Sequence, residues 1–359
     1  FFIPIELSFS CWFFYIFSKF QRIMGSAFGW KALPGFPYFN HQVAGGWLSL
    51  FCIALFMMRR HIKKVLTGAK DKDAPMSYKM AITGMVFGIG AMVLFVTVAG
   101  MSVWIALSFV LLLFAMELTV TRIRAELGPP QHEFYYVGPE YILYTALGSR
   151  RLGGKNLTMF AFLYFSDRTL GSHPMPHQLE GFKLAQMVGI NSKRLAAAML
   201  ISVVVGIIFS LWSLLHSAYK LGVASRFLGY VGIPWESFGR LASRLQYPRG
   251  ADYPGIIFIG LGFVFSLGLM AMRMRFLWWP LHPVGYVLSS TGWIINYIWF
   301  SFLVSWLIKL VIIKYGGIRN YRKAIPFFIG LILGEYVVGC FWDLLGISLG
   351  METYGFYED

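Results

Sequence analysis

Three side chains with metal-binding chemistry lie close together in the string SHPMPHQLE: His173, His177 and Glu180. Spacings of four and three residues would place them on one face of a helix, where imidazole and carboxylate groups can ligate a metal ion. The two prolines of this string argue against a regular helix across the two histidines. A helix that starts here and continues over residues 178–193 is therefore the favoured interpretation, and a metal site is the alternative.

Two further motifs carry ionisable groups beside prolines. Arg124 and Glu126 stand in RAELGPP, directly before a double proline. This turn either binds or gates a substrate, or it is a basic helix end with a salt bridge. His282 stands between two prolines in PLHPVGY. It is either a proton site, because the pKa of an unperturbed histidine is about 6.5, or a hydrogen-bonded structural residue.

Several carboxylates lie inside long apolar runs, among them Glu6, Glu117 and Glu335. Ionisable groups at membrane depth are costly and are candidates for function. Glu335 stands among glycines in GLILGEYVVG, and small residues favour close helix packing. It would either accept a proton from a coupled ion or act as a structural partner of a basic residue on a neighbouring helix. A transport role for Glu335 requires a polar cavity beside it. Asp343 lies nearer the end of its run, and we expect it to be solvated.

The composition places these residues in a membrane protein. Hydrophobic residues make up 57% of the chain, charged residues make up only 13%, and the mean hydropathy is +0.63. Soluble domains carry roughly 25% charged residues. Several runs here approach the roughly 20 apolar residues that cross a bilayer. Because these runs are continuously apolar and do not alternate, we expect an all-α polytopic transmembrane bundle and not a barrel.

The net charge of +15 has a topological explanation. Lysine and arginine cluster between the apolar runs, most densely from Arg59 to Lys79, as the positive-inside rule describes. We therefore expect membrane lipids as partners, and not nucleic acid. The cysteines are expected to be buried free thiols, because all three lie in apolar runs without CxxC spacing.

The chain divides into three parts. Residues 1–120 form a first group of spans and residues 195–359 a second group. The polar, broken segment 121–194 between them either lines a pathway or forms a cytoplasmic loop domain. The apolar runs predict spans at residues 1–17, 43–58, 80–98, 101–120, 195–216, 255–272, 293–308 and 325–345.

Two proline-interrupted pieces are expected to be broken or re-entrant legs. Basic residues flank Trp30–Gln42 on both sides, and they also flank Phe276–Gly292. Because basic residues mark the cytoplasmic side of the membrane, each piece must help to return the chain to that side. This requires that Lys19 and Arg22 mark the cytoplasmic end of the first span; the alternative is that they snorkel from the other side. The last basic residue is Lys323, which predicts an outer C-terminus.

An amphipathic helix is predicted near residues 233–246, in an outer loop. Its apolar side chains share one face, and Arg240 and Arg244 share another, a pattern typical of a helix in the membrane interface. Pro234 suits the first turn of this helix. Asn191 is expected to cap the span that follows the central segment.

Six strings together resemble one group of proteins. They are ELSFSCWFFY (6–15), LPGFPYFNHQ (33–42), RAELGPPQHEF (124–134), SHPMPHQLEGFKLA (172–185), FLWWPLHPVGYVLS (276–289) and KYGGIRNYRKAIPFFIGLILGEYVVG (314–339). The group consists of prokaryotic polytopic membrane proteins of unassigned function that are described as distant relatives of the oligopeptide transporter family. The chain looks like the C-terminal half of a longer protein of this kind, and it lacks the NPG-type signature of that family. The resemblance implies a secondary transporter fold in the cytoplasmic membrane, with proton coupling as one option.

Two functions from different classes follow. The first is a proton- or ion-coupled secondary transporter for a peptide-like or metal-chelate solute, favoured by the broken legs and the polar central segment. The second is a non-catalytic membrane subunit that scaffolds a larger assembly or a homo-oligomer, favoured by the 18% aromatic residues and the amphipathic outer helix. The chain has no recognisable catalytic, nucleotide or haem motif, so we expect neither an enzyme nor a cofactor. The candidate pathway residues are Glu6, Glu117, Arg124, Glu126, His173, His177, Glu180, His282 and Glu335.

Overall fold

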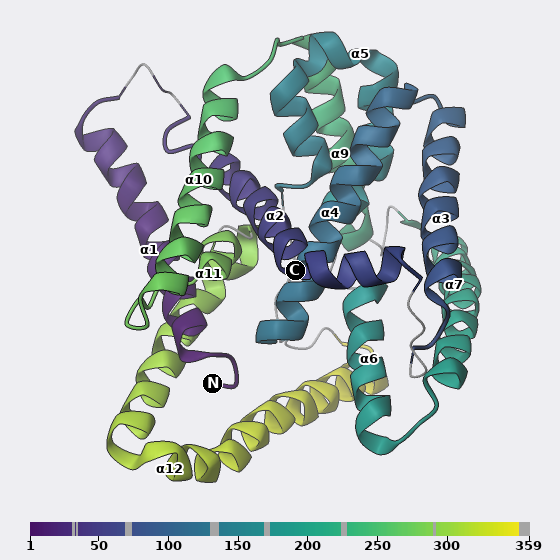
Figure 1. The fold of residues 1–359 in the computed structure, drawn as a ribbon. Coiled ribbons are helices and arrows are strands. Elements are labelled where there is room, and N and C mark those ends of the chain that lie inside the picture. The colour runs from purple at the N-terminus through teal and green to yellow at the C-terminus, as the bar shows by residue number, and fades with distance from the viewer. Residues whose placement is uncertain are drawn as a thin grey trace.

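The computed structural model describes residues 1–30, 33, 35–68, 74–129, 136–168, 173–223, 228–289 and 292–351. Within these ranges the regular secondary structure is helical and no strand occurs (Figure 1). The helices in chain order are α1 (Ile5–Ala27), α2 (Phe39–Leu66), α3 (Tyr78–Val98), α4 (Val103–Leu127), α5 (Pro139–Arg168), α6 (Pro174–Val188), α7 (Ser192–Leu221), α9 (Leu228–Gln246), α10 (Tyr253–Arg275), α11 (Pro283–Leu288) and α12 (Gly292–Leu349).

Six of the described helices are long and apolar enough to cross a membrane: α2, α3, α4, α7, α10 and α12. The spans predicted at residues 80–98 and 101–120 are present as α3 and α4, which are joined by a short turn at Gly100, where φ is 121°. The predicted cap of α7 is also present, since the Asn191 side chain accepts two backbone N–H groups of the first turn. The all-α transmembrane bundle expected from the composition is therefore confirmed.

The first helix is longer than predicted. The run of residues 1–17 forms only its first part, and α1 continues past Lys19 and Arg22 to Ala27. Lys19 Nζ donates to Asn296 Oδ1 of α12 at 3.3 Å. Helix α1 therefore extends beyond the predicted run, and the side of the membrane on which Lys19 and Arg22 lie stays a prediction.

The two proline-interrupted pieces take different forms. Residues 31, 32 and 34 of the first piece lie outside the described ranges, and α2 begins at Phe39 within it. The second piece contains α11, whose six residues are all buried. Helix α12 then includes both of the spans predicted after it, with a non-helical backbone at Gly317 (φ 64°), and it changes direction part-way along (Figure 1).

Helices α2 and α10 pack backbone against backbone. A Cβ atom added at Gly45 of α2 would overlap the carbonyl oxygen of Ile259, and one added at Gly262 of α10 would overlap that of Gln42. Glycines at a crossing allow such an approach between membrane helices. Both helices also contact α11, and α10 contacts α5, so this pair lies at the centre of the described bundle.

Helix α5 is broken and packs inside the bundle. Gly148 (φ 70°, ψ 163°) and Gly153 (φ 74°, ψ 163°) have a non-helical backbone and separate two helical arms. A Cβ atom at Gly148 would overlap the backbone of Gly250, and Arg150 N–H donates to Arg249 O at 3.1 Å. These contacts hold the turn between the two arms against the loop that precedes α10. The rest of α5 packs against α4 and α9.

Helix α9 turns its basic face toward the protein. It begins earlier than predicted, so that Pro234 lies inside the helix and not in its first turn. Arg244 forms an ion pair with the buried carboxylate of Glu140 on α5. Trp235 is exposed, so the apolar face is the one that points outward. Arg244 thus pairs with a protein carboxylate, and the position of α9 in the membrane interface stays a prediction.

Candidate functional site

Helices α4 and α6 are joined by two ion pairs. Glu117 Oε2 of α4 lies 3.1 Å from His173 Nε2, directly before α6. Arg124 Nε lies 2.6 Å from Glu180 Oε1. The two partners on each side are seven residues apart, or two helical turns, and residues at that spacing share one face of a helix. The four side chains therefore form two successive links between the same two segments.

The prolines of SHPMPHQLE start α6 and do not interrupt it. Pro174 is the first residue of the helix and Pro176 lies in the same turn. Proline is tolerated there because the first N–H groups of a helix have no partner within it. The predicted helix start at these prolines is therefore confirmed, but the helix ends at Val188 and does not run through to residue 193. His173 is consequently the N-cap residue, and its ring reaches α4.

The Glu117–His173 pair is buried. The two side chains are 11% and 9% exposed, respectively. His173 Nδ1 is also buried, and it has no hydrogen-bond partner in the described part of the chain. Burial of an ionisable group is costly unless a partner compensates the charge. The contact with Glu117 Oε2 therefore compensates the burial of the His173 ring.

The Arg124–Glu180 pair is more exposed and belongs to a larger cluster. Its side chains are 23% and 41% exposed. Arg124 Nη1 also donates to Pro129 O at 2.6 Å, which fixes the guanidinium at the end of α4. His177 Nδ1 lies 3.9 Å from Glu180 Oε2. This geometry assigns Arg124 a partner on α6, although the sequence placed it beside Glu126.

Glu126 pairs with a different arginine. Arg122 Nη2 lies 2.6 Å from Glu126 Oε1, one turn along the same helix. Arg122 Nη1 donates to Ala54 O of α2 at 2.9 Å. Glu126 is therefore part of a contact between α4 and α2, on the side of α4 that does not face α6.

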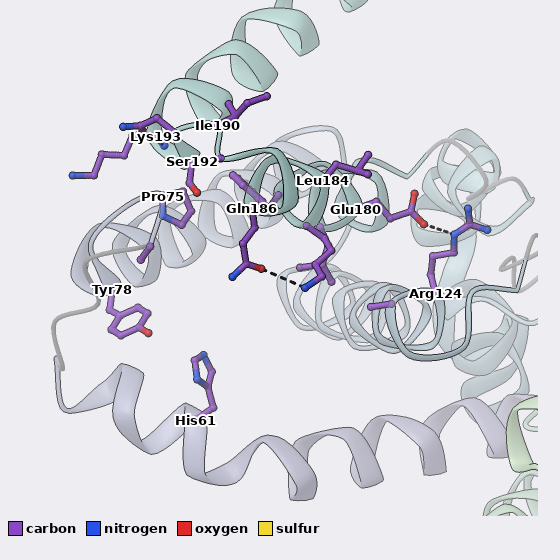
Figure 2. Close-up of a pocket in the computed structure, with 17 residues that line it drawn as sticks. His61, Pro75, Tyr78, Arg124, Glu180, Leu184, Gln186, Ile190, Ser192 and Lys193 are labelled. Atoms are coloured by element: carbon purple, nitrogen blue, oxygen red, sulfur yellow. Dashed lines mark hydrogen bonds and ion pairs between the residues drawn. The ribbon is translucent and has the colours of Figure 1, made fainter. Parts of the chain in front are cut away.

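A cavity of about 1330 Å³ opens beside the Arg124–Glu180 pair. Its wall is formed by residues near the ends of α2 and α4, by α6, and by the starts of α3 and α7 (Figure 2). Lys183 and Lys193 also line it, so three cationic side chains face one carboxylate. Ligand sites of proteins combine apolar walls with a few polar groups of this kind. Lys193 has no local sequence signal for this role, because only the turn between α6 and α7 brings it to the same wall as Lys183.

The proposed metal ligands do not gather around one point. His173 contacts Glu117, whereas Glu180 contacts Arg124 and lies at 3.9 Å from His177. The described residues contain no group of three or more His, Cys, Asp or Glu side chains suited to a metal ion. Within the described chain, a metal site at His173, His177 and Glu180 is thus not supported.

Three further candidates lie away from this site. His282 Nδ1 accepts the backbone N–H of Val284 at 3.1 Å and caps α11, which favours the structural interpretation. Glu6 lies in the first turn of α1, within electrostatic reach of Lys309. Glu335 is exposed on α12 and is not part of the cavity wall. This cavity therefore does not supply the polar cavity that a transport role for Glu335 requires.

These features define an integral membrane protein of the helical-bundle class, with ionisable pairs between its helices. A family model described as a family of unknown function (DUF6785) matches residues 1–358, and the chain belongs to that family. No curated protein and no solved structure matches the chain. The resemblance to the oligopeptide transporter family stays a prediction, because none of these comparisons bears on it.

Proposed function

We propose that this protein is a proton-coupled secondary transporter of small solutes that carry an anionic group. Peptide-like and metal-chelate solutes are the classes to test first, and the cytoplasmic membrane of a prokaryotic cell is the proposed location. The observation that carries the proposal is the buried Glu117–His173 pair, which lies two helical turns from an ion pair in a cavity wall.

The two ion pairs supply a mechanism of coupling because they link the same two segments. An anionic group of the solute competes with Glu180 for the guanidinium of Arg124, since carboxylates bind arginine through strong charge-assisted bonds. A proton on Glu117 removes its attraction for His173. Loss of one link leaves the other in place, whereas loss of both frees α4 from α6. Movement of the helices then requires both solute and proton.

The surroundings of the site support an anionic solute. Within the described chain, no ion pair joins Lys183 or Lys193 to a carboxylate. Both lysines are exposed at the cavity wall, so their charges attract anions from solution.

The test uses the full-length protein in vesicles that contain a pH-sensitive dye. Dipeptides and ferric citrate are supplied on one side, and both solute uptake and internal pH are followed. We expect solute-driven proton movement in the wild type. Glu117→Gln should abolish proton movement while solute exchange persists, and Glu126→Gln serves as the matched control. Absence of uptake with every solute, or unchanged coupling in Glu117→Gln, contradicts the proposal.

The anionic preference has its own variants. Lys183→Gln combined with Lys193→Gln should raise the solute concentration needed for half-maximal uptake, because the cavity loses two charges. Lys314→Gln removes a charge from an exposed site outside the cavity wall and should leave that concentration unchanged. If the double lysine variant and Lys314→Gln changed the half-maximal solute concentration equally, the cavity would not be the site that selects the solute.

A second function, that of a subunit in a larger assembly, is favoured by α7. No residue of its most apolar window is buried inside the described chain. Lipid covers such a helix in a monomer, whereas another subunit covers it in an assembly. The test introduces a cysteine at Leu211 and identifies what it cross-links to. Cross-linking to a stoichiometric partner chain would favour the assembly, whereas cross-linking to lipid alone would rule out this second function.

A further inference from the structure

A histidine, a tyrosine and an aspartate from three helices meet outside the site described above. Tyr141 Oη of α5 lies 2.8 Å from His41 Nδ1 and 3.1 Å from His41 Nε2. His41 Nε2 lies 3.6 Å from Oδ2 of Asp252, the N-cap residue of α10. No local spacing indicates this cluster, because its members are far apart in the chain.

The backbone is arranged to make room for the cluster. A Cβ atom on Gly255 would lie 2.6 Å from His41 Nε2, so the imidazole occupies the space that a larger residue would fill. Asp252 Oδ1 accepts the Gly255 N–H at 3.0 Å, and this leaves Oδ2 for His41. Asp252 N–H donates to Thr145 O at 2.9 Å, which holds α5 and α10 in register at this point.

Exposure to solvent changes along the cluster. The Asp252 side chain is 41% exposed, whereas that of His41 is only 13% exposed. Water therefore reaches the carboxylate, and the imidazole lies behind it. The titratable groups that face His41 are Asp252 of α10, Tyr141 of α5 and Tyr38, whose ring centre lies 5.4 Å away. Burial disfavours a proton on His41, and the charge of Asp252 favours one.

The cluster lies toward the opposite end of the bundle from the Glu117–His173 pair. His41 is in the first turn of α2, whereas Arg122, five positions after Glu117 on α4, binds Ala54 O on the same helix. Residue 54 is 13 positions beyond residue 41, or about 20 Å along a helix that rises 1.5 Å per residue. One histidine–carboxylate pair therefore lies toward each end of the bundle.

We infer that His41, with Asp252 and Tyr141, forms a second proton-binding site, at the end of the bundle opposite the basic ends of α2 and α10. A proton from water enters past Asp252 and binds to the unprotonated ring nitrogen of His41. In the imidazolium both ring nitrogens are donors, and Asp252 and Tyr141 Oη offer acceptors to them. The role of this site as the second port of the coupled proton rests on the proposed transport function, whereas proton binding itself does not.

The test is a pH titration of the full-length, ¹⁵N-histidine-labelled protein in lipid nanodiscs, followed by NMR. The His41 signals are those lost in His41→Gln. We expect these signals to titrate, and the midpoint to move to lower pH by about one unit in Asp252→Asn, because the carboxylate that favours the imidazolium is lost. Asn caps helices as well as Asp does, so this variant should fold. Tyr141→Phe should shift the midpoint in the same direction.

The matched control is Asp343→Asn, which removes an exposed carboxylate far along the chain and should leave His41 unchanged. A His41 signal that keeps one protonation state throughout, or a midpoint unmoved by Asp252→Asn, overturns the inference. A purely structural cluster would lower stability in these variants without moving the midpoint. The titration uses no solute, so it tests the His41 site independently of transport. If His41 titrates but the vesicle assay shows no solute-driven proton movement, the proton-binding site stands and only the transport proposal is refuted.

Discussion

Glu117 and His173 are 56 positions apart in the chain, yet their side chains meet at 3.1 Å in the interior and join α4 to the start of α6. The nearest carboxylate on the same helix that can serve for comparison is Glu126, whose side chain is 55% exposed. The two glutamates therefore allow one substitution to be compared in a buried pair and in an exposed pair.

Glu117→Gln should lower the free energy of unfolding by about 3 kcal/mol, because it leaves the buried His173 without its charged partner. Glu126→Gln should cost less than about 1 kcal/mol, as exposed ion pairs do. Both values can be measured by reversible denaturant titration in detergent, with tryptophan fluorescence as the probe. Equal losses of unfolding free energy in the two variants would contradict the burial of the Glu117–His173 pair.

The α2–α10 contact predicts opposite effects of the same substitution at two neighbouring glycines. Gly262→Ala places a methyl group on the Gln42 carbonyl and should destabilise the protein by about 3 kcal/mol. Gly260→Ala meets open space and should stabilise α10 by up to about 1 kcal/mol, because alanine favours the helix. Thermal unfolding of the two variants measures the difference. A stable Gly262→Ala protein would disprove the close crossing.

His282 should make the protein sensitive to acid. Burial, with a smaller effect of Arg273, lowers the pKa of His282 to about 3, whereas an unfolded histidine has a pKa of about 6.5. As pH falls below about 6.5, the unfolded state takes up a proton that the folded state does not, so stability is lost progressively toward the folded pKa.

The variant His282→Asn tests this effect, since Asn retains an oxygen that can cap the Val284 N–H but does not titrate. Between about pH 7 and pH 5 the melting temperature should fall less in the variant than in the wild type. Parallel curves for the two proteins would show that His282 does not contribute to the loss.

The orientation in the membrane can be tested with cysteines at the two ends of the bundle. In a background with Cys11, Cys52 and Cys340 replaced, Tyr247→Cys should react with a membrane-impermeant maleimide added to intact cells. Met76→Cys, near the basic end of α2, should react only in inverted vesicles, because basic residues stay on the cytoplasmic side. The reverse pattern would invert the proposed orientation and place the His41 cluster on the cytoplasmic side.

Much of the helical framework could be predicted from the chain alone. Continuous apolar runs located α3, α4, α7 and α10, and local chemistry gave the turn at Gly100 and the cap at Asn191. The end of α1 could not be predicted, because Lys19 is stabilised by Asn296 on a distant helix. Local signals were therefore sufficient except where a tertiary contact compensated a charge.

The site was only partly predictable. Glu117, Arg124, His173 and Glu180 were all candidates, but their pairing depends on how α6 docks against α4. Glu335 had the same sequence signal as Glu117, a carboxylate in an apolar run, and is exposed. Nothing local distinguishes the two residues, because burial is decided by the packing of whole helices.

The contact of α2 with α10 also determines which parts of the protein can move. Where two backbones touch without intervening side chains, a small rotation or slide brings main-chain atoms into collision, because there are no rotamers that can adjust. These two helices therefore behave as one rigid frame. In the proposed transport cycle, a change of shape would be carried by the side-chain-mediated contacts around that frame, which include the two links between α4 and α6.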